Sequence, residues 1–366
     1  MSLRVYTNLD ELAELAEPWN RLAAGVPMRS YTWLGAWARH YADQRWQPRV
    51  CAVADGDKLI GLAPWRLEQS VRAGRVLRWL GDGEVCTDHL TVLVDPGHRV
   101  QVVNELADWL CEQQHEWDAL DLDHSDSSDQ TLSHLFEELA RRGCAVESVP
   151  DDACWAVALP TDWEAYLALQ SKSHRKQLRR AVRRVRDAQQ CRWTPVASRD
   201  DWEQAWPILV ELHQRRRQSL GEPGCFASSR FTAFHREVSL ALLVEGGLRM
   251  SWLELAGRPA AAEYHLAGDD AVYAYQGGVD PDQLAEEPGR LSTIATLQHA
   301  MQEGKVSFDL LRGDEPYKAH WRATPQPTLR RRAAAPRRSA RLRAQANRAA
   351  DRVRGLLKTG IRRKGS

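Results

Sequence analysis

Residues 308–321 read FDLLRGDEPYKAHW, a short apolar strand that runs into a turn crowded with ionisable and aromatic side chains. Folds place chemistry rather than packing where strand ends present acids, bases and rings beside Gly and Pro. Two segments precede this one: residues 273–281, YAYQGGVDP, and residues 287–292, EPGRLS, which open an apolar-periodic helix. The predicted order is therefore strand, glycine turn, helix and second strand.

The rest of the chain repeats this plan. In the first half, hydrophobic periodicity predicts helices at 8–24, 31–43, 99–114 and 129–142, and strands at 50–54, 59–67, 76–80, 119–122 and 144–149. In the second half it predicts strands at 248–256, 258–267, 271–277 and 305–311 around a helix at 289–303. Val94-Asp95-Pro96 and Val279-Asp280-Pro281 precede the corresponding helices. The pattern indicates an α+β fold that shades into α/β, with an internal duplication.

Charge is distributed unevenly along the chain. The total is +1, but residues 331–366 contain 13 Lys and Arg against the single acid Asp351, a net charge of +12. Their apolar residues fall at near-helical spacing, so we expect either a basic amphipathic helix or a disordered tail, with an anionic membrane surface or nucleic acid as its partner. Residues 326–333 are expected to add a last strand. A second basic helix is expected over residues 171–186, with Leu178, Val182 and Val185 as its apolar stripe. Its basic faces are either simply solvated or bind phosphate.

The amino-acid composition limits the classes of protein to which the chain can belong. The chain has 366 residues, 43% of them hydrophobic and 27% charged, which is enough for two domains with cores of their own. Its seven cysteines are scattered singly, which favours reduced, mostly buried thiols over zinc ligands or disulfides. Residues 1–10 have no apolar signal segment, and no run of 18 apolar residues occurs. We expect a cytoplasmic protein without a metal or a transmembrane segment, or one held peripherally at the inner membrane surface.

Three motifs in this order resemble the acyltransferase domain of the CelD/BioF2-like branch of the GNAT superfamily, which is related to the FemABX aminoacyl transferases. The motifs are the 308–321 segment, the GVDP turn with the PGRL helix start, and SHRKQLRR at 173–180. The resemblance covers residues 155–325 and is only architectural before them. It implies tandem GNAT-like halves, each a mixed twisted sheet flanked by helices. The expected domains are 1–154, an acyltransferase half at 155–330, and the basic tail at 331–366.

The resemblance implies acyl-CoA, with acetyl-CoA as the first choice, as the co-substrate. A pyrophosphate group suits a helix N-terminus with a glycine for close approach and a basic side chain as counter-charge. Gly289, Arg290, Leu291 and Ser292 fit that description, and Gly278 and Val279 in the preceding turn complete the expected cofactor site. Glu286 and Glu287 lie immediately upstream and would repel phosphate unless they point away. The common Arg/Gln-x-x-Gly-x-Gly/Ala pattern is absent, and the helix start can equally be an ordinary one.

Several residues are candidates for the chemistry. Glu263 lies on a strand, where burial would raise its pKa towards neutral pH and make it a base. His265, two residues on and facing the same way, is the alternative base. Asp280 and Asp309 are further carboxylates between which spacing does not choose.

The turn after the last strand offers two more candidates. The Tyr317 hydroxyl can protonate a leaving thiolate, and Lys318 can bind a phosphate or stabilise an oxyanion, with Asp309 to orient it. A purely structural salt bridge is the competing interpretation. The expected substrate contacts are Tyr275, Asp280, Arg175, Arg179 and Trp321, although core packing also explains a Tyr or Trp at these positions.

Three functions remain open at this stage. The leading hypothesis is an N-acyltransferase that acts on the amine of a sugar, an amino acid or an envelope or polysaccharide precursor. An aminoacyl-tRNA-dependent transferase is the second, with the basic helix and tail holding the RNA backbone. The third is a module of the same fold without catalysis, which serves exopolysaccharide assembly.

Overall fold

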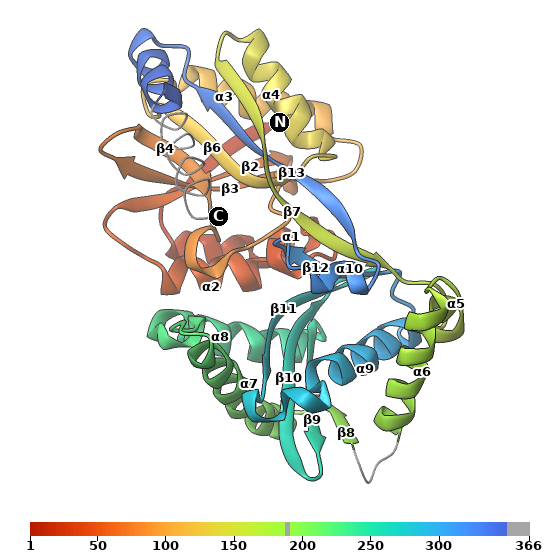
Figure 1. Ribbon diagram of the computed structural model, residues 1–366. Helices are drawn as coiled ribbons and strands as arrows, with labels where there is room; N and C mark the ends of the chain where they lie inside the picture. Colours follow the sequence, from red (N-terminus) through yellow and green to blue (C-terminus); the bar gives the residue numbers. More distant parts are fainter. Residues whose placement is uncertain (187–190, 350–366) are drawn as a thin grey trace. The chain divides into compact units, whose positions relative to one another are not determined.

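The computed structural model describes residues 1–186 and 191–349 (Figure 1). The chain divides into two compact units. Unit 1 comprises residues 1–23, 37–152 and 327–366, and unit 2 comprises residues 24–36 and 153–326. This division departs from the expected boundaries in three places, because residues 24–36 and 153–154 belong to unit 2 and residues 327–330 to unit 1.

Unit 2 is built on a mixed sheet in the order β7-β12-β11-β10-β9-β8. Its strands are β7 (Ala145–Ala158), which begins in unit 1, β8 (Cys191–Pro195), β9 (Leu248–Leu255), β10 (Arg258–Ala267), β11 (Ala271–Val279) and β12 (Ser307–Arg312). Neighbouring strands in this order are antiparallel, except β11 and β12, which are parallel. The parallel pair is joined by the crossover helix α9 (Pro288–Gln302), as parallel strands require.

Helices cover both faces of this sheet. One side carries α7 (Arg199–Ser219) and α8 (Ser229–Glu245), and the other carries α9 beside α5 (Trp163–Ala168) and α6 (Lys172–Arg186) (Figure 1). The short helix α10 (Tyr317–His320) follows β12. Helix α7 begins with a capping box between Ser198 and Asp201, which satisfies its first backbone N–H groups. The core between α9 and the sheet includes Leu253, Ile294, Leu297 and Phe308, each at most 1% exposed.

Unit 1 repeats the plan with the order β1-β2-β3-β4-β6-β13. Its strands are β1 (Ser2–Tyr6), β2 (Trp46–Asp55), β3 (Lys58–Ser70), β4 (Gly74–Trp79), β5 (Leu93–Val94), which pairs with β3, β6 (Ala119–Asp126) and β13 (Thr324–Ala334). Here β4 and β6 are the parallel pair. The helices are α1 (Ala16–Leu22), α3 (Arg99–Glu112), α4 (Gln130–Arg141) and the end of α2 (Tyr31–His40). Tandem halves with mixed sheets flanked by helices, as expected, are confirmed.

The basic segment after residue 330 is not free at its start. Residues 331–334 complete β13, paired with β6, and residues 338–349 are helical. Arg337 donates to the carbonyl oxygens of Gln114 and Trp117 and pairs with Asp118 at 2.7 Å. The start of the expected tail is therefore part of a strand of unit 1, and Arg337 binds unit 1 itself. Residues 350–366 lie outside the described residues. Among the described helices, none has the length and apolarity that a membrane crossing needs.

Candidate acyl-transfer site

The parallel strands of unit 2 separate after a short paired stretch. Among the described residues, β11 and β12 pair only from Ala271 with Ser307 to Tyr273 with Asp309. Strand β11 continues to Val279 while β12 ends at Arg312. Beyond Tyr273, the β12-facing edge of β11 therefore presents backbone N–H and C=O groups that this ladder does not use. An extended ligand can pair with such an edge.

Strand β11 is also irregular at this point. Gln276 pairs with Tyr264 and Ala274 with His265, so Tyr275 is one residue more than β10 can match. Such a bulge bends the strand and re-aims its side chains, as occurs beside active sites. The Tyr275 hydroxyl lies 3.0 Å from Nε2 of the fully buried His235 on α8. The Trp33 ring packs edge-on against Tyr275 with centroids 5.2 Å apart. Sequence reasoning missed Trp33 and His235, because they come from distant helices and no motif contains them.

Glu263 projects from β10 towards α9. One carboxylate oxygen accepts from Thr296 Oγ1 at 2.6 Å and lies 3.1 Å from His265 Nε2, and the other accepts from Thr293 Oγ1 at 3.2 Å. Burial alone would raise the pKa of Glu263, but the hydrogen bonds and the charge of His265 outweigh burial and lower the pKa. The expectation of a raised pKa is therefore wrong. Glu263 is ionised at neutral pH and points, with His265, under α9.

The N-terminus of α9 lies at the end of β11. Glu287 at the N-cap has φ of 55°, and Pro288 opens the first turn. A Cβ added to Gly289 would come within 3.1 Å of the Val279 side chain, so glycine permits this close approach. Arg290 lies on the surface of the first turn, where it pairs with Glu287 at 3.0 Å.

Two of the expected cofactor contacts turn inwards. Leu291 is 1% exposed and Ser292 is fully buried, where its hydroxyl helps to lower the pKa of Glu263. Neither side chain reaches a ligand at the surface. A Cβ on Gly278 would come within 2.4 Å of the His213 backbone nitrogen in α7. Gly278 therefore admits a helix backbone, and the expectation that it admits a cofactor is corrected.

Lys318 is buried, with 1% of the residue exposed. Its ammonium donates to the carbonyl oxygens of Leu311, Arg312 and Gly313 at 2.8–3.1 Å and pairs with Glu315 at 2.9 Å. An ammonium has three donors, and these carbonyls account for them. Lys318 therefore fixes the turn after β12, and the expectation that it binds a phosphate or an oxyanion is corrected.

Asp309 supports the same turn. Its Oδ1 accepts from the Leu311 backbone N–H at 2.7 Å, where Leu311 has φ of 55° and β12 carries an extra residue relative to β7. The expectation that Asp309 orients Lys318 is wrong, because the carboxylate that contacts Lys318 belongs to Glu315. Both residues hold a strained backbone that sets the position of α10.

Tyr317 begins α10 and is 52% exposed as a residue. Partial burial, together with the negative charges of Glu315 and Glu263, raises the pKa of Tyr317 to about 12. The hydroxyl is therefore protonated at neutral pH, and the field of Glu263 reaches it. The structure thus links Glu263 and Tyr317 electrostatically, although the sequence supplies them from separate segments.

The four other expected substrate contacts differ in their surroundings. Asp280, at the end of β11, accepts from the Asp282 backbone and from Gln283, and pairs with Arg215 at 2.8 Å. Arg175 donates to the carbonyl oxygens of Leu167, Ala168 and Gln170, which closes the end of α5. Trp321 is 7% exposed in the core. Arg179 is exposed and pairs with Glu164 at 2.9 Å.

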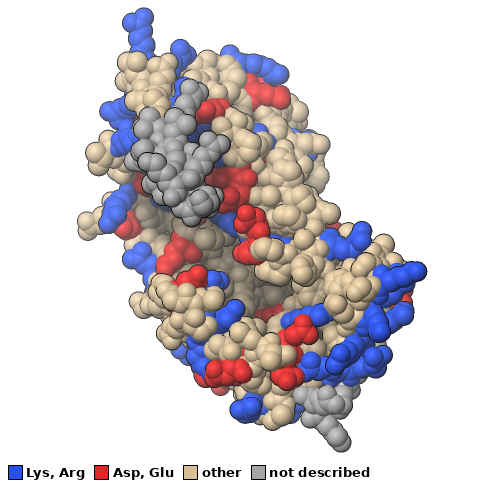
Figure 2. Space-filling model, viewed as in Figure 1, with Lys and Arg blue, Asp and Glu red and all other residues tan. Residues whose placement is uncertain are grey.

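The outer face of α6 is strongly basic. Figure 2 shows Lys and Arg side chains gathered where α6 lies in Figure 1. The exposed members are Lys172, Lys176, Arg179, Arg180 and Arg183. The inner face packs beside the start of α9, where Arg184 contacts Glu286 and Gln177 contacts Arg290. The described residues contain no group of three or more His, Cys, Asp or Glu placed to hold a metal ion.

Comparison with known proteins agrees with this geometry. The family model of the GNAT acetyltransferase domain matches residues 172–319. No curated protein matches the sequence. Among solved structures, FemX has a TM-score of 0.64 at 12% identity, over 93% of this chain and 99% of that chain.

Two further structures share the fold at 12% identity. The C-terminal domain of a putative lysylphosphatidylglycerol synthetase from Agrobacterium fabrum has a TM-score of 0.57, over 91% of this chain and 95% of that chain. L-PGS from Bacillus licheniformis has a TM-score of 0.52, over 91% and 93%. At this identity the likenesses concern the fold. Residues 172–319 are therefore similar to the GNAT acetyltransferase domain, and the chain shares its fold with FemX.

Proposed function

We propose that the chain transfers an acyl group from acyl-CoA to the amine of a small acceptor, namely a sugar, an amino acid or an envelope precursor. The observation that carries the proposal is the separation of β11 from β12 with the start of α9 at its end. The extended arm of the donor pairs with the open edge of β11. The pyrophosphate lies at the N-terminus of α9, where backbone N–H groups and the helix dipole favour an anion.

The charges around α9 support this placement of the donor. Glu287 is neutralised by Arg290, and Glu286 by Arg184. The two acids that would repel a phosphate therefore have basic partners, and the exposed arginines and lysines of α6 lie alongside. Arg290 is the residue best placed to exchange Glu287 for a phosphate.

Glu263 and Tyr317 divide the chemistry. The acceptor nitrogen attacks the thioester carbon, a C–N bond forms, and the C–S bond breaks to release the thiolate. The ionised Glu263 attracts the incoming ammonium and takes its proton, directly or through a water. The protonated Tyr317 hydroxyl donates its proton to the departing sulfur, and it regains a proton from the nitrogen, which loses its second proton as the amide forms. Backbone N–H groups at the bulge of β11 stabilise the carbonyl oxygen in the transition state.

Thiol release from acetyl-CoA and longer acyl-CoAs, measured with a panel of amines, tests the proposal. Glu263→Gln is expected to lower turnover by about 10²- to 10⁴-fold, the usual contribution of a positioned acid or base. Tyr317→Phe is expected to lower turnover with little change in donor affinity, and Arg290→Ala to weaken donor binding. Arg192→Gln removes an exposed arginine on β8 and serves as the control. Equal turnover in Glu263→Gln and the control would contradict the assignment.

One observation favours a second donor, an aminoacyl-tRNA. The exposed basic residues of α6 follow one another at helical spacing beside the start of α9, a surface that suits a phosphate backbone. If no acyl-CoA stabilises the protein or releases thiol, binding of aminoacyl-tRNA should be measured at rising salt. Lys176→Gln with Arg180→Gln would then weaken binding and reduce its salt dependence, whereas unchanged binding would exclude α6 as the contact.

A further inference from the structure

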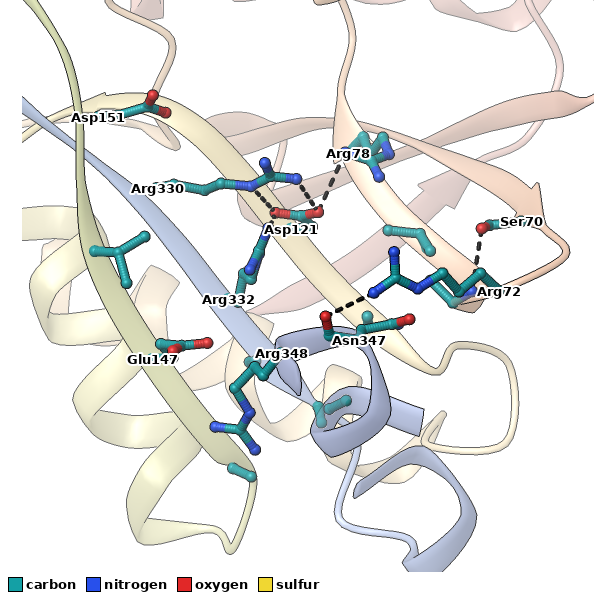
Figure 3. A pocket seen from close by; sticks show the side chains of 18 of the residues that line it. Ser70, Arg72, Arg78, Asp121, Glu147, Asp151, Arg330, Arg332, Asn347 and Arg348 are labelled. Carbon is teal, nitrogen blue, oxygen red and sulfur yellow. Dashed lines mark hydrogen bonds and ion pairs between the residues drawn. The ribbon is translucent and has the colours of Figure 1, made fainter. Parts of the chain in front are cut away.

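A pocket of about 820 Å³ lies entirely within unit 1 (Figure 3). Its floor is the face of the sheet formed by β4, β6 and β13, and β7 lines one side. The helix over residues 338–349 contributes Asn347 and Arg348 to its wall. Pockets of this volume accommodate small molecules.

The pocket is dominated by arginine. Five of them line it: Arg72, Arg78, Arg330, Arg332 and Arg348. The acids in the lining are Asp121, Glu147 and Asp151, so the lining carries two positive charges in excess. Excess arginine in a concave, partly desolvated site favours an anion with two charges.

Three of the arginines converge on Asp121 from three directions. Arg330 holds the carboxylate through Nε and Nη2 at 2.7 and 2.6 Å, Arg332 lies 3.2 Å away, and Arg78 from β4 lies 3.3 Å away. Burial alone would raise the pKa of Asp121, but these guanidinium groups lower it. Arg78 also pairs with Glu68 at 3.4 Å, so these three cations share two carboxylates. Each guanidinium has five N–H donors, of which one or two point at Asp121.

The remainder of the lining leaves room for an organic group. Small side chains stand where larger ones would fill the space: Ala73, Ala119, Ala145, Ala333, Ala334 and Ala344. Val76 and Val149 add apolar surface. The pocket therefore offers an arginine cluster at one place and an apolar wall beside it.

The pocket is not a second copy of the acyl-donor site. The counterpart of the α9 N-terminus in unit 1 is the start of α3, which follows β5, and no residue of α3 or β5 lines the pocket. Ala119 and Asp121 belong to the first three residues of β6, whereas the donor site of unit 2 lies where β11 ends. The pocket therefore needs a ligand of its own.

We propose that this arginine-lined pocket of unit 1 binds a phosphate monoester with an apolar or aromatic body. The dianionic phosphate lies on Arg78, Arg330 and Arg332, and the organic group lies on the alanines and valines. A soluble phosphorylated metabolite and a phospholipid headgroup share this chemistry. The proposal is independent of the donor that unit 2 uses.

Calorimetric titration of the full-length chain with phenyl phosphate tests the proposal, with phenol as the probe that lacks the phosphate. Wild type is expected to bind phenyl phosphate and not phenol. Arg332→Gln and Arg78→Gln are expected to weaken binding at least tenfold, and the unit 2 control Arg192→Gln to leave it unchanged. Circular dichroism melting checks that each variant folds. If neither pocket variant folds, Arg348→Gln replaces them, because Arg348 has no ion-pair partner among the described residues and its loss costs the fold little.

A parallel measurement separates the two sources of phosphate. Flotation with phosphatidylcholine vesicles, with and without phosphatidic acid, reports on a lipid headgroup. Recovery with phosphatidic acid that Arg332→Gln abolishes, without binding of phenyl phosphate, assigns the pocket to lipid. Binding of phenyl phosphate alone assigns it to a soluble ligand. Failure of both probes, or equal binding by wild type and the pocket variants, would overturn the proposal.

Discussion

The two units share a backbone frame and differ in what fills it. The Asp95 N–H donates to the Ile60 carbonyl in unit 1, and the Asp280 N–H donates to the Ala260 carbonyl in unit 2, each at 2.8 Å. Gly61 pairs with Val94 as Ala261 pairs with Val279. Counting along the strands from these pairs places Ala63 at the position of Glu263. Unit 1 therefore keeps the frame without the carboxylate that we assign to catalysis.

The interface beneath the crossover helix shows the same contrast. In unit 1, a Cβ on Gly61 would come within 2.3 Å of Val102, so α3 lies directly on β3 through apolar contact. In unit 2, α9 meets β10 through the hydrogen bond from Thr296 to Glu263. An apolar interface stabilises a unit by burying apolar surface, whereas a polar interface keeps a charged side chain hydrogen-bonded and ionised.

The gap between the parallel strands also differs. In unit 2, β11 runs unbroken to Val279. In unit 1, residues 80–92 stand between β4 and β5 and bind the far end of β6, with His89 3.0 Å from Asp126. The loop thus occupies the strand end that the corresponding part of unit 2 leaves open. One frame can serve as a scaffold or as a site according to this insertion.

The strongest test of the contrast puts the missing carboxylate into unit 1. Ala63 is fully buried and has no counterpart of Thr296 or His265 against α3, so Ala63→Glu is expected to cost about 3–5 kcal/mol as an uncompensated buried charge. Denaturant unfolding measures the loss. Ala63→Gln has nearly the same size without the charge and should cost less, and the gap should close at low pH as the glutamate is protonated. Equal losses at all pH values would show that the effect is steric.

The second largest effect is expected in the turn after β12 of unit 2. Lys318→Met leaves three backbone carbonyls without their donor and is expected to lower the free energy of unfolding by about 2–3 kcal/mol. Glu315→Gln, in a side chain that is 56% exposed, should have little effect. A stable Lys318→Met protein that has lost only turnover would restore a direct catalytic role for the lysine.

Substitution of the neighbouring glycines Gly277 and Gly278 of β11 tests how closely α7 packs against this strand. Leu93 stands in unit 1 at the position of Gly278, because it pairs with Leu62 as Gly278 pairs with Ala262. Gly278→Ala forces α7 away and is expected to cost about 1–2 kcal/mol by overpacking. Gly277→Ala meets its nearest neighbour at an ordinary 3.5 Å and should cost less. Thermal unfolding compares them, and an equal cost would place the strain elsewhere.

The smallest expected effect is the dependence of stability on pH that the ionisation of Glu263 causes. Its pKa is lowered in the fold, so its ionised form contributes stability above the ordinary value of 4.5, and this contribution is lost as pH falls through the folded pKa. The stability difference between wild type and Glu263→Gln should therefore shrink from pH 6 to pH 3. Parallel curves for the two proteins would show that Glu263 has no favourable partners in the fold.

Much of the frame could be predicted from the sequence because its signals are local. The PGRL segment predicted a helix from 289, and α9 begins at Pro288. The two-residue spacing of Glu263 and His265 predicted a shared face, and the side chains meet at 3.1 Å. Periodicity and turn residues act within a few positions of the chain, which is why they can be read directly.

The partners of the charged residues could not be predicted in this way. The sequence placed Lys318 beside Asp309 as a reactive pair, but the curvature of the turn brings three carbonyl oxygens to the ammonium instead. His235 and Trp33 reach Tyr275 from helices about 40 and 240 positions away. Spacing along a strand says which side chains share a face and not which helix covers that face.

By itself the sequence determined the order of strands and helices, the duplicated turn and the set of ionisable residues near the ends of strands. Only the tertiary structure decided three things. Glu263 is held ionised, Lys318 donates its hydrogen bonds to backbone carbonyl oxygens, and arginines from β4 and β13 meet around Asp121. The reason is physical. Local propensity depends on neighbours in the chain, whereas the charge state and the availability of a side chain depend on burial and on partners that only folding brings within hydrogen-bonding distance.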